Sequence, residues 1–282
     1  MILPRVCIVS GADRFTVPSY VNQEIWAREF GYDYRLQSLP DAGDHNYYFL
    51  KPSALRHYLP YYDWVFWVDD DVYFTDFTED RIAGLIAEAE QAERSIILAD
   101  GVREPNGWWN VVNAGVMLVR NDEHGLRFLN SVLEPLEQLV AEWWDPEIVG
   151  KQCGGDQDVV HYALVELGMR DHALIVDHMR LNARPHHYRT LKDGTTVHFA
   201  GHPDKALSVI DFSRAMGVSD LLVPKALLDK YGMRRQTVLL PGEERRRRMR
   251  LSVHMKGRAM ATRLGAKEQV KSAVAKVRDV IA

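Results

Sequence analysis

Short runs of β-branched, aliphatic and aromatic residues recur along most of this chain, and segments with helical spacing separate most of them. The first run, residues 6–11, precedes a segment from 19 to 30 whose apolar residues share one face of a helix. This alternation predicts an α/β fold in which helices cover a mostly parallel central sheet. The other expected strands are 64–69, 95–100, 116–120, 173–177 and 196–200.

A longer helical pattern follows the fourth expected strand. Its apolar stripe runs from Leu126 to Val140, after a capping pair at Asn121 and Asp122. Pro135 lies inside the pattern, and proline cannot donate the backbone hydrogen bond that a continuous helix needs. We interpret this segment as structural packing.

Size and cysteine content restrict the class of protein. A chain of 282 residues with 46% hydrophobic residues can bury one large core, with or without an appendage. The apolar run near the amino terminus is too short for an export signal or a membrane span. Cys7 and Cys153 are too few for a disulfide framework or a four-ligand zinc site. We therefore expect a globular protein of the reducing cytoplasm.

Charge is divided unevenly along the chain. Residues 233–282 carry 14 Lys and Arg and 4 Asp and Glu, a net charge of +10, which leaves 21 − 35 = −14 for residues 1–232. This asymmetry predicts a main domain at 1–232 and a basic amphipathic tail at 233–282. Such a tail suits peripheral contact with anionic lipids at the inner membrane face, and a merely solvated helix is the alternative. Nucleic acid is not an expected partner, because no recognition motif accompanies the arginines.

Three consecutive carboxylates, Asp69, Asp70 and Asp71, follow the aromatic strand expected at 64–69. Like charges crowded at the end of a buried strand cost stability unless a cation or several donors compensate them. Alternate residues of a strand share a face, so Asp69 and Asp71 are expected to point together and Asp70 away. Carboxylate oxygens suit Mg²⁺ or Mn²⁺, whose remaining positions can be filled by a nucleotide diphosphate. A solvated acidic turn is the alternative.

Four motifs occur in a recognisable order. They are a helix bearing Lys51 that leads into the acidic triplet, then Asn113-Ala114-Gly115, Asp156-Gln157, and His198-Phe199-Ala200-Gly201. Together they resemble the GT-A glycosyltransferases, whose fold is Rossmann-like. The resemblance is strongest to the retaining galactosyl-, mannosyl- and xylosyltransferases of family 34, and family 8 enzymes share these motifs. Relatives often place a phosphate-binding lysine close behind the late His-x-x-Gly, whereas here three residues intervene before Lys205.

The resemblance implies a retaining glycosyltransferase that moves a hexose or pentose from a nucleoside-diphosphate sugar, expected to be UDP-linked. The acceptor would be a hydroxyl of a glycan or a lipid-linked glycan. The implied cofactor is Mn²⁺, with Mg²⁺ as the alternative, because His198 would join Asp69 and Asp71 as a metal ligand. Asp156 and Gln157 would face the anomeric carbon as catalytic residues. The implied nucleotide-sugar ligands are Lys51, Asp69, Asp70, Asn113, Ala114, Gly115, Gly201 and Lys205.

Each role has a structural alternative. His198 can be an ordinary core histidine, Lys51 an exposed lysine, and Asp156 a helix N-cap. Ser10, Gly11 and Ala12 lie at the carboxyl end of the first strand, where open α/β sheets bind ligands, and a plain turn is the alternative. In the loops, aromatic and imidazole rings suit an acceptor sugar but can also cover the core edge; these are Trp108, Trp109, His186 and His187.

Two other functions remain open at this point. A sugar nucleotidyltransferase would also use a metal and an α/β sheet, but the first strand is not followed by a Gly-rich loop bearing Lys or Arg. A non-catalytic carbohydrate- or membrane-binding module is the third possibility. Release of UDP from a UDP-sugar with Mn²⁺ distinguishes these functions.

Overall fold

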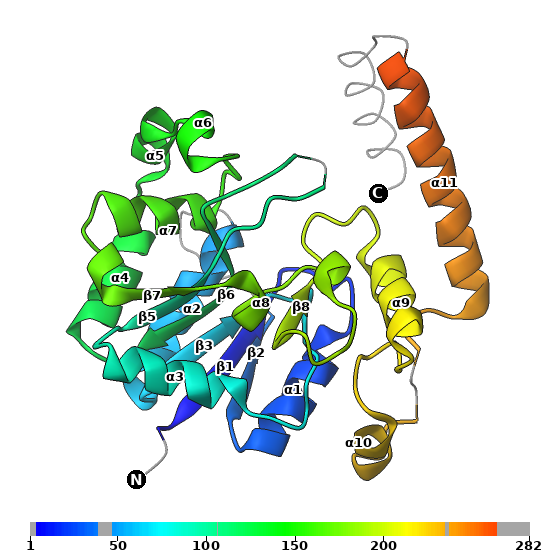
Figure 1. Cartoon of the computed structure of the whole chain (residues 1–282), viewed down its shortest axis with the longest axis horizontal. Helices are drawn as coiled ribbons and strands as arrows, with labels where there is room; N and C mark the ends of the chain where they lie inside the picture. Colours follow the sequence, from blue (N-terminus) through cyan, green and yellow to red (C-terminus); the bar gives the residue numbers. More distant parts are fainter. Residues whose placement is uncertain (1–3, 39–46, 106, 235–236, 264–282) are drawn as a thin grey trace.

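The computed structural model describes residues 4–38, 47–105, 107–234 and 237–263 (Figure 1). Its centre is a six-stranded sheet of order β2-β1-β3-β6-β5-β7. Strands β1 and β2, β1 and β3, and β5 and β7 pair in parallel, whereas β6 is antiparallel to both β3 and β5. The strands are β1 (Val6–Gly11), β2 (Asp33–Gln37), β3 (Trp64–Val68), β5 (Ile96–Asp100), β6 (Val112–Arg120) and β7 (Ala173–Val176).

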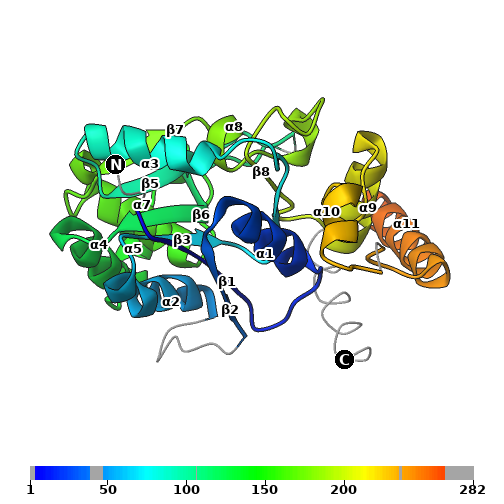
Figure 2. The same cartoon turned by 90° about the horizontal axis from the view of Figure 1, so that it is seen from below.

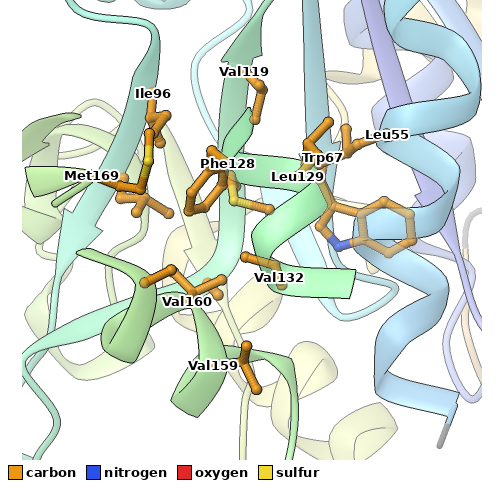
Figure 3. Packing of buried hydrophobic residues seen from close by; sticks show 14 of the residues in the cluster. Leu55, Trp67, Ile96, Val119, Phe128, Leu129, Val132, Val159, Val160 and Met169 are labelled. Carbon is orange, nitrogen blue, oxygen red and sulfur yellow. The ribbon is translucent and has the colours of Figure 1, made fainter. Parts of the chain in front are cut away.

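Helices cover both faces of this sheet because its central strands are apolar on both sides. Alternate residues of β1 and β3 enter two separate hydrophobic clusters. One cluster is completed by α2 (Leu50–Tyr58), α4 (Glu123–Leu133) and α7 (Asp156–Val165), and the other by α1 (Ser19–Phe30) and α3 (Arg81–Gln91). Figure 2 shows α2 and α4 on the opposite side of the sheet from α3. Figure 3 shows part of the first cluster, whose members include Phe128 and Leu129 of α4 and Trp67 of β3.

The expected strands and the first helix are confirmed, with ends that differ by a few residues. The longer helical pattern is two helices, α4 and α5 (Glu137–Trp143), because the chain leaves the helix at Glu134 immediately before Pro135. Asp122 caps α4 by accepting a hydrogen bond from the backbone N–H of Gly125 at 2.9 Å. The placement of Leu126 on the buried stripe is wrong, since its side chain is exposed.

A second, two-stranded sheet lies beside the carboxyl end of β3. It pairs β4 (Val72–Phe74) antiparallel with β8 (Thr196–His198), so that Val72 lies opposite His198. The chain reaches β8 through α8 (His178–Leu181) and the short 3-10 helix η4 (Pro185–His187). Other short helices are η1 (Tyr47–Phe49), η2 (Leu59–Tyr61), α6 (Pro146–Val149) and η3 (Arg170–His172).

The carboxyl-terminal part packs outside this core. Helices α9 (Lys205–Met216), α10 (Lys225–Lys230) and α11 (Pro241–Arg263) follow β8, and α11 lies along α9 in Figure 1. Ion pairs join the two long helices, including Arg214 to Glu244 at 2.7 Å and Arg248 to Asp211. Of the basic tail expected at 233–282, residues 235–236 and 264–282 lie outside the described residues. Within the described ranges, no helix is both long enough and apolar enough to cross a membrane.

Candidate functional site

The acidic triplet forms a tight loop between β3 and β4, and its backbone is held from two sides. Asp69 donates its N–H to the carbonyl of Gly115 in β6 at 2.9 Å. From α1, the hydroxyl of Ser19 donates to the carbonyl of Asp70 at 2.5 Å, and the amide of Gln23 donates to the carbonyl of Asp69 at 3.0 Å. The loop conformation is therefore imposed by neighbouring elements rather than by the three aspartates themselves.

Asp69, Asp71 and His198 converge on one point. The Nε2 atom of His198 lies 3.1 Å from Oδ1 of Asp71 and 3.9 Å from Oδ2 of Asp69. One ligand atom from each residue lies within 4.8 Å of the other two. Pairing of β4 with β8 brings His198 to the acidic loop across more than a hundred residues of sequence. Lys205, the first residue of α9, places Nζ 2.8 Å from the other oxygen of Asp71.

The surroundings of Asp71 and Asp70 shift the pKa values of these two carboxyls in opposite directions. Burial opposes ionisation of Asp71, but the charges and hydrogen bonds of His198 and Lys205 outweigh it and lower the pKa of this carboxyl. Burial and the charge of Asp71 instead raise the pKa of Asp70 to about 7. Asp71 is thus the carboxylate that its surroundings stabilise in the charged form, as a metal ligand requires.

Gly115 lies directly under the imidazole of His198. A Cβ atom at this position would lie 2.2 Å from Cε1 and 2.7 Å from Nδ1 of the ring, closer than real Cβ atoms approach a neighbour. The small residue in the Asn-Ala-Gly motif therefore makes room for the histidine of the late His-x-x-Gly motif. Two motifs that the sequence separates by more than eighty residues are in van der Waals contact.

Lys51 connects the acidic loop to the start of α7. Its Nζ atom lies 2.6 Å from the carbonyl of Ala114, 3.0 Å from Oδ2 of Asp156 and 3.3 Å from Oδ1 of Asp69. Burial lowers the pKa of Lys51, but Asp156 and Asp69 raise it by more. The ammonium donates a hydrogen bond to the carbonyl of Ala114 and forms ion pairs with the two carboxylates. Lys51 is therefore a buried cation between two carboxylates and not the exposed lysine of the alternative interpretation.

Asp156 and Gln157 open α7 beside this cation. Gly155 is the N-cap of the helix, so Asp156 is its first residue and does not cap it. Burial raises the pKa of Asp156, and Lys51 partly offsets this effect. Gln157 accepts a hydrogen bond from the N–H of Ala114 at 3.2 Å. Asp156 through its ion pair and Gln157 through its hydrogen bond are therefore connected to β6 and the acidic loop.

The predicted acceptor residues lie in two loops that an ion pair joins. Trp108 is exposed, and the Nζ atom of Lys151 lies 3.4 Å from its ring centroid. Lys151 belongs to the segment that leads to Asp156, and its N–H donates to the carbonyl of Trp109 at 2.9 Å. Glu104 in the same loop as these tryptophans pairs with Arg184 at 2.5 Å.

His186 and His187 are the last two residues of η4, which begins directly after Arg184, and their ring centroids are 4.2 Å apart. Burial lowers the pKa of His187. The pair between Glu104 and Arg184 joins the loop that carries the two tryptophans to the segment that carries the two histidines.

The remaining predicted residues lie at or after the ends of the strands that lead to the site: Ser10, Gly11 and Ala12 at the end of β1, and Gly201 after β8. Ser10 and Gly11 are buried at the carboxyl end of β1, and a Cβ on Gly11 would lie 2.5 Å from the carbonyl oxygen of Gln37. Ala12 donates its N–H to the same carbonyl at 3.2 Å. Gly201 has a φ of +72°, a conformation that favours glycine, in the turn between β8 and α9.

A divalent cation fits the donor set of Asp69, Asp71 and His198. Two carboxylates and one imidazole suit Mn²⁺, which accepts nitrogen ligands more readily than Mg²⁺ does. The three donor atoms are already gathered within 4.8 Å, and the Nζ of Lys205 contacts the same carboxylate. This arrangement can hold a metal beside a diphosphate.

Sequence reasoning missed three residues that position the site. Ser19 and Gln23 hold the acidic loop from α1, and Asn182 contacts the ring of His198 at 3.0 Å. Polar residues inside apolar helical spacing were the available signal for Ser19 and Gln23. Asn182 follows Leu181 without any motif, so its role depends on contacts that only the folded chain makes.

Comparison with known proteins gives similarity in structure alone, since no protein-family model and no curated protein matches this chain. A glycosyltransferase involved in the glycosylation of the major capsid of PBCV-1 matches with a TM-score of 0.54 and 16% identity, covering 76% of this chain and 99% of that one. The apo form of mouse xyloside xylosyltransferase 1 matches with a TM-score of 0.39 and 13% identity over 64% of this chain and 87% of its own. The chain therefore has the fold of the GT-A glycosyltransferases.

Proposed function

We propose that this protein is a metal-dependent glycosyltransferase that moves a hexose or pentose from a nucleoside-diphosphate sugar, UDP-linked by preference, to a hydroxyl of a glycan or glycolipid. The observation that carries the proposal is the convergence of Asp69, Asp71 and His198 at the end of β3. The GT-A fold supports the same reaction class. We further propose that transfer retains the anomeric configuration, as in glycosyltransferase families 34 and 8.

A metal bound between these three side chains, Mn²⁺ in preference to Mg²⁺, would neutralise charge that develops on the leaving diphosphate. Lys205, whose Nζ is 2.8 Å from Asp71, adds a second positive charge at the same place. Burial lowers the pKa of Lys205, but Asp71 and Asp70 raise it by more, so this amine keeps its proton. Asn113, Ala114, Gly115 and Gly201 would line the donor sugar, and Ser10, Gly11 and Ala12 the base.

Asp156 is the residue we assign to the reacting carbon. It is buried, it opens α7, and Lys51 lies 3.0 Å from its carboxylate. This ion pair holds the carboxylate in place, where it can stabilise positive charge on the sugar as the glycosidic bond breaks. Gln157, whose Oε1 binds the backbone of Ala114, would orient the acceptor hydroxyl. Trp108, Trp109, His186 and His187 would contact the acceptor sugar.

Release of UDP tests this function. The protein is mixed with Mn²⁺ and each of several UDP-sugars, and we expect slow hydrolysis of one donor that EDTA abolishes. Asp71→Asn should lower this rate at least about 100-fold while the protein stays folded, because it removes a charged metal ligand. Asp63→Asn, at an exposed carboxylate beside Arg5, is the matched control and should leave the rate unchanged. A fully active Asp71→Asn enzyme would contradict the proposal.

The same assay separates the other two functions. A sugar nucleotidyltransferase would release pyrophosphate from a nucleoside triphosphate and a sugar phosphate, and would leave UDP-sugars uncleaved. A carbohydrate-binding module would leave every donor intact. No observation on the described residues favours either function over sugar transfer.

For the basic helix α11 we propose contact with anionic lipid at the cytoplasmic face of a membrane. Arg247 and Arg248 pair with acidic residues. The exposed outward face instead carries Met249 and Val253 flanked by basic side chains. Those basic side chains are Arg245, Arg246, Arg250 and Lys256.

Vesicle sedimentation tests the contact with lipid. Binding should require anionic lipid, weaken with salt, and be lost when the four outward basic residues are replaced by Glu. Equal binding to neutral vesicles would contradict it.

A further inference from the structure

A chain of hydrogen bonds runs from the backbone of β6 to the imidazole of His198. The N–H of Gly115 donates to Oδ1 of Asn113 at 2.9 Å, and the same oxygen lies 2.6 Å from Nδ2 of Asn182. Oδ1 of Asn182 lies 3.0 Å from Nδ1 of His198. Asn182 and His198 are 2% and 3% exposed, so water does not compete for these bonds.

The direction of every bond in this chain follows from its first member. A backbone N–H can only donate, so the atom of Asn113 that faces Gly115 must be its oxygen. That oxygen can only accept, and the atom of Asn182 that faces it must therefore be the amide nitrogen. The oxygen of Asn182 is then left to face His198, and Nδ1 of the ring must carry the hydrogen.

The position of this hydrogen also determines which nitrogen of His198 is available to a metal. With its proton on Nδ1, a neutral imidazole carries its lone pair on Nε2. Nε2 is the atom that lies 3.1 Å from Asp71 and 3.9 Å from Asp69. Nε2 is therefore the nitrogen that faces the two carboxylates, where it donates to Asp71 while it carries a proton and can bind a cation once that proton is released.

The backbone fixes the register of this contact. The N–H of His198 donates to the carbonyl of Ala183 at 2.9 Å, and the N–H of Ala183 donates to the carbonyl of Thr196 at 3.2 Å. Ala183 therefore runs beside β8 as an additional bridge, and the residue before it lies next to the ring. Asn182 cannot shift along the chain without breaking both of these backbone bonds.

We propose that Asn182 is a positioning residue that holds His198 in its Nδ1-protonated form, with Nε2 ready to bind the metal. This inference rests on the proposed function for the metal, but the hydrogen bond from Nδ1 to Asn182 exists in the metal-free protein. Partners of this kind raise metal affinity about 10- to 100-fold by orienting the ligand. The proposal also gives the Asn113 side chain a defined task, since its oxygen sets the direction of the amide of Asn182.

Nitrogen NMR of the metal-free protein tests the hydrogen bond from Nδ1 directly. Spectra of ¹⁵N-histidine-labelled protein are recorded, and His198→Gln identifies its signals among the 11 histidines. We expect a protonated Nδ1 in the wild-type protein. A ring whose only proton lies on Nε2 would overturn the proposal whether or not the protein binds metal.

Mn²⁺ binding, followed by electron paramagnetic resonance, tests the consequence. Asn182→Leu should weaken binding at least about tenfold, and Asn182→Asp, which still accepts from Nδ1 but cannot donate to Asn113, should recover part of this loss. Asn121→Leu, an exposed asparagine before α4, is the matched control and should bind as the wild type does.

A folded Asn182→Leu protein with unchanged affinity would overturn the positioning role. A wild-type protein that binds no Mn²⁺ would instead contradict the proposed function. Should Asn182→Leu fail to fold, Asn182→Asp and the proton on Nδ1 of the wild-type protein still decide the question.

Discussion

Gly115 has no side chain, and this allows the backbone of β6 to lie close to the His198 ring of β8. The His198 ring occupies the space that a Cβ atom would need, with Cε1 only 2.2 Å from that position. This contact, and not the backbone conformation, is the reason for glycine here, because the φ of Gly115 is not positive and other residues could adopt it. The site therefore depends on a residue that binds nothing through its own side chain.

Gly115→Ala should displace His198 by roughly 1 Å and weaken Mn²⁺ binding at least about tenfold, since a ligand moved this far loses its geometry. Titration with Mn²⁺ followed by calorimetry measures the effect. Gly84→Ala in α3 is the matched control, because a Cβ there meets nothing within 4 Å. This control should keep its Mn²⁺ affinity and gain up to about 1 kcal/mol of stability. Equal affinity in both variants would contradict the packing argument.

Lys51 is the residue on which we expect stability to depend most. Lys51→Met leaves the carboxylates of Asp69 and Asp156 without their shared cation, and breaking a buried ion pair in this way costs about 3–5 kcal/mol. Urea unfolding measures the loss. Lys225→Met removes an exposed pair with Asp229 and should cost less than about 1 kcal/mol. Similar midpoints for the two variants would show that Lys51 is not held between charges.

At the scale of elements, α11 is attached to α9 mainly through charge. Glu244 accepts from Arg214 of α9 at 2.7 Å and from Arg248 of its own helix at 2.9 Å, whereas Glu243 pairs within α11, with Arg247. Glu244→Gln should therefore loosen α11 and speed tryptic cleavage at Arg245–Arg248. Glu243→Gln, its neighbour, should change this rate little. Equal rates in the two variants would mean that apolar contacts of Leu251 hold the helix.

The same pair predicts a pH dependence. Hydrogen bonds from Arg214 and Arg248 lower the pKa of Glu244 to about 2. Because the folded pKa lies below the unfolded value of about 4.3, the attachment is fully present above that value and is lost as the pH falls toward about 2. Hydrogen exchange of α11 amides, compared with unstructured-peptide rates at each pH, should show this release. The Glu244→Gln variant should lack it.

Elements also differ in how well the sequence predicts them. The segment 19–30 was predicted with its observed bounds because its apolar residues fall on one helical face. The pattern from Leu126 to Val140 became two helices because Pro135 removes a backbone donor in the middle. Hydrophobic periodicity indicates which residues can be buried, but it indicates the ends of a helix less precisely.

For the molecule as a whole, we expect the metal and the nucleotide to stabilise the fold together. Ligands at about 100 times their dissociation constants add about 2.7 kcal/mol each, which for a domain of this size corresponds to roughly 5–10 °C in melting temperature. Mn²⁺ and UDP together should therefore raise the melting temperature by more than either alone. Thermal melting measures this shift, and Asp71→Asn should remove the part that depends on Mn²⁺. An equal shift in Asp71→Asn would place the metal elsewhere.

The sequence by itself predicted the α/β class and the strands β1, β3, β5, β6, β7 and β8, but not β2 or β4, because local periodicity and residue type are all that it supplies. Residue type also gave the hypothesis of a metal at the acidic triplet. The sequence also indicated Asn113, Asp156 and His198 through motif order. Only the tertiary structure decided that Lys51 lies between Asp69 and Asp156, that Gly115 supports the ring of His198, and that Asn182 sets the direction of its hydrogen bond. These contacts join residues far apart in the chain, and strand pairing and helix packing alone determine which side chains meet.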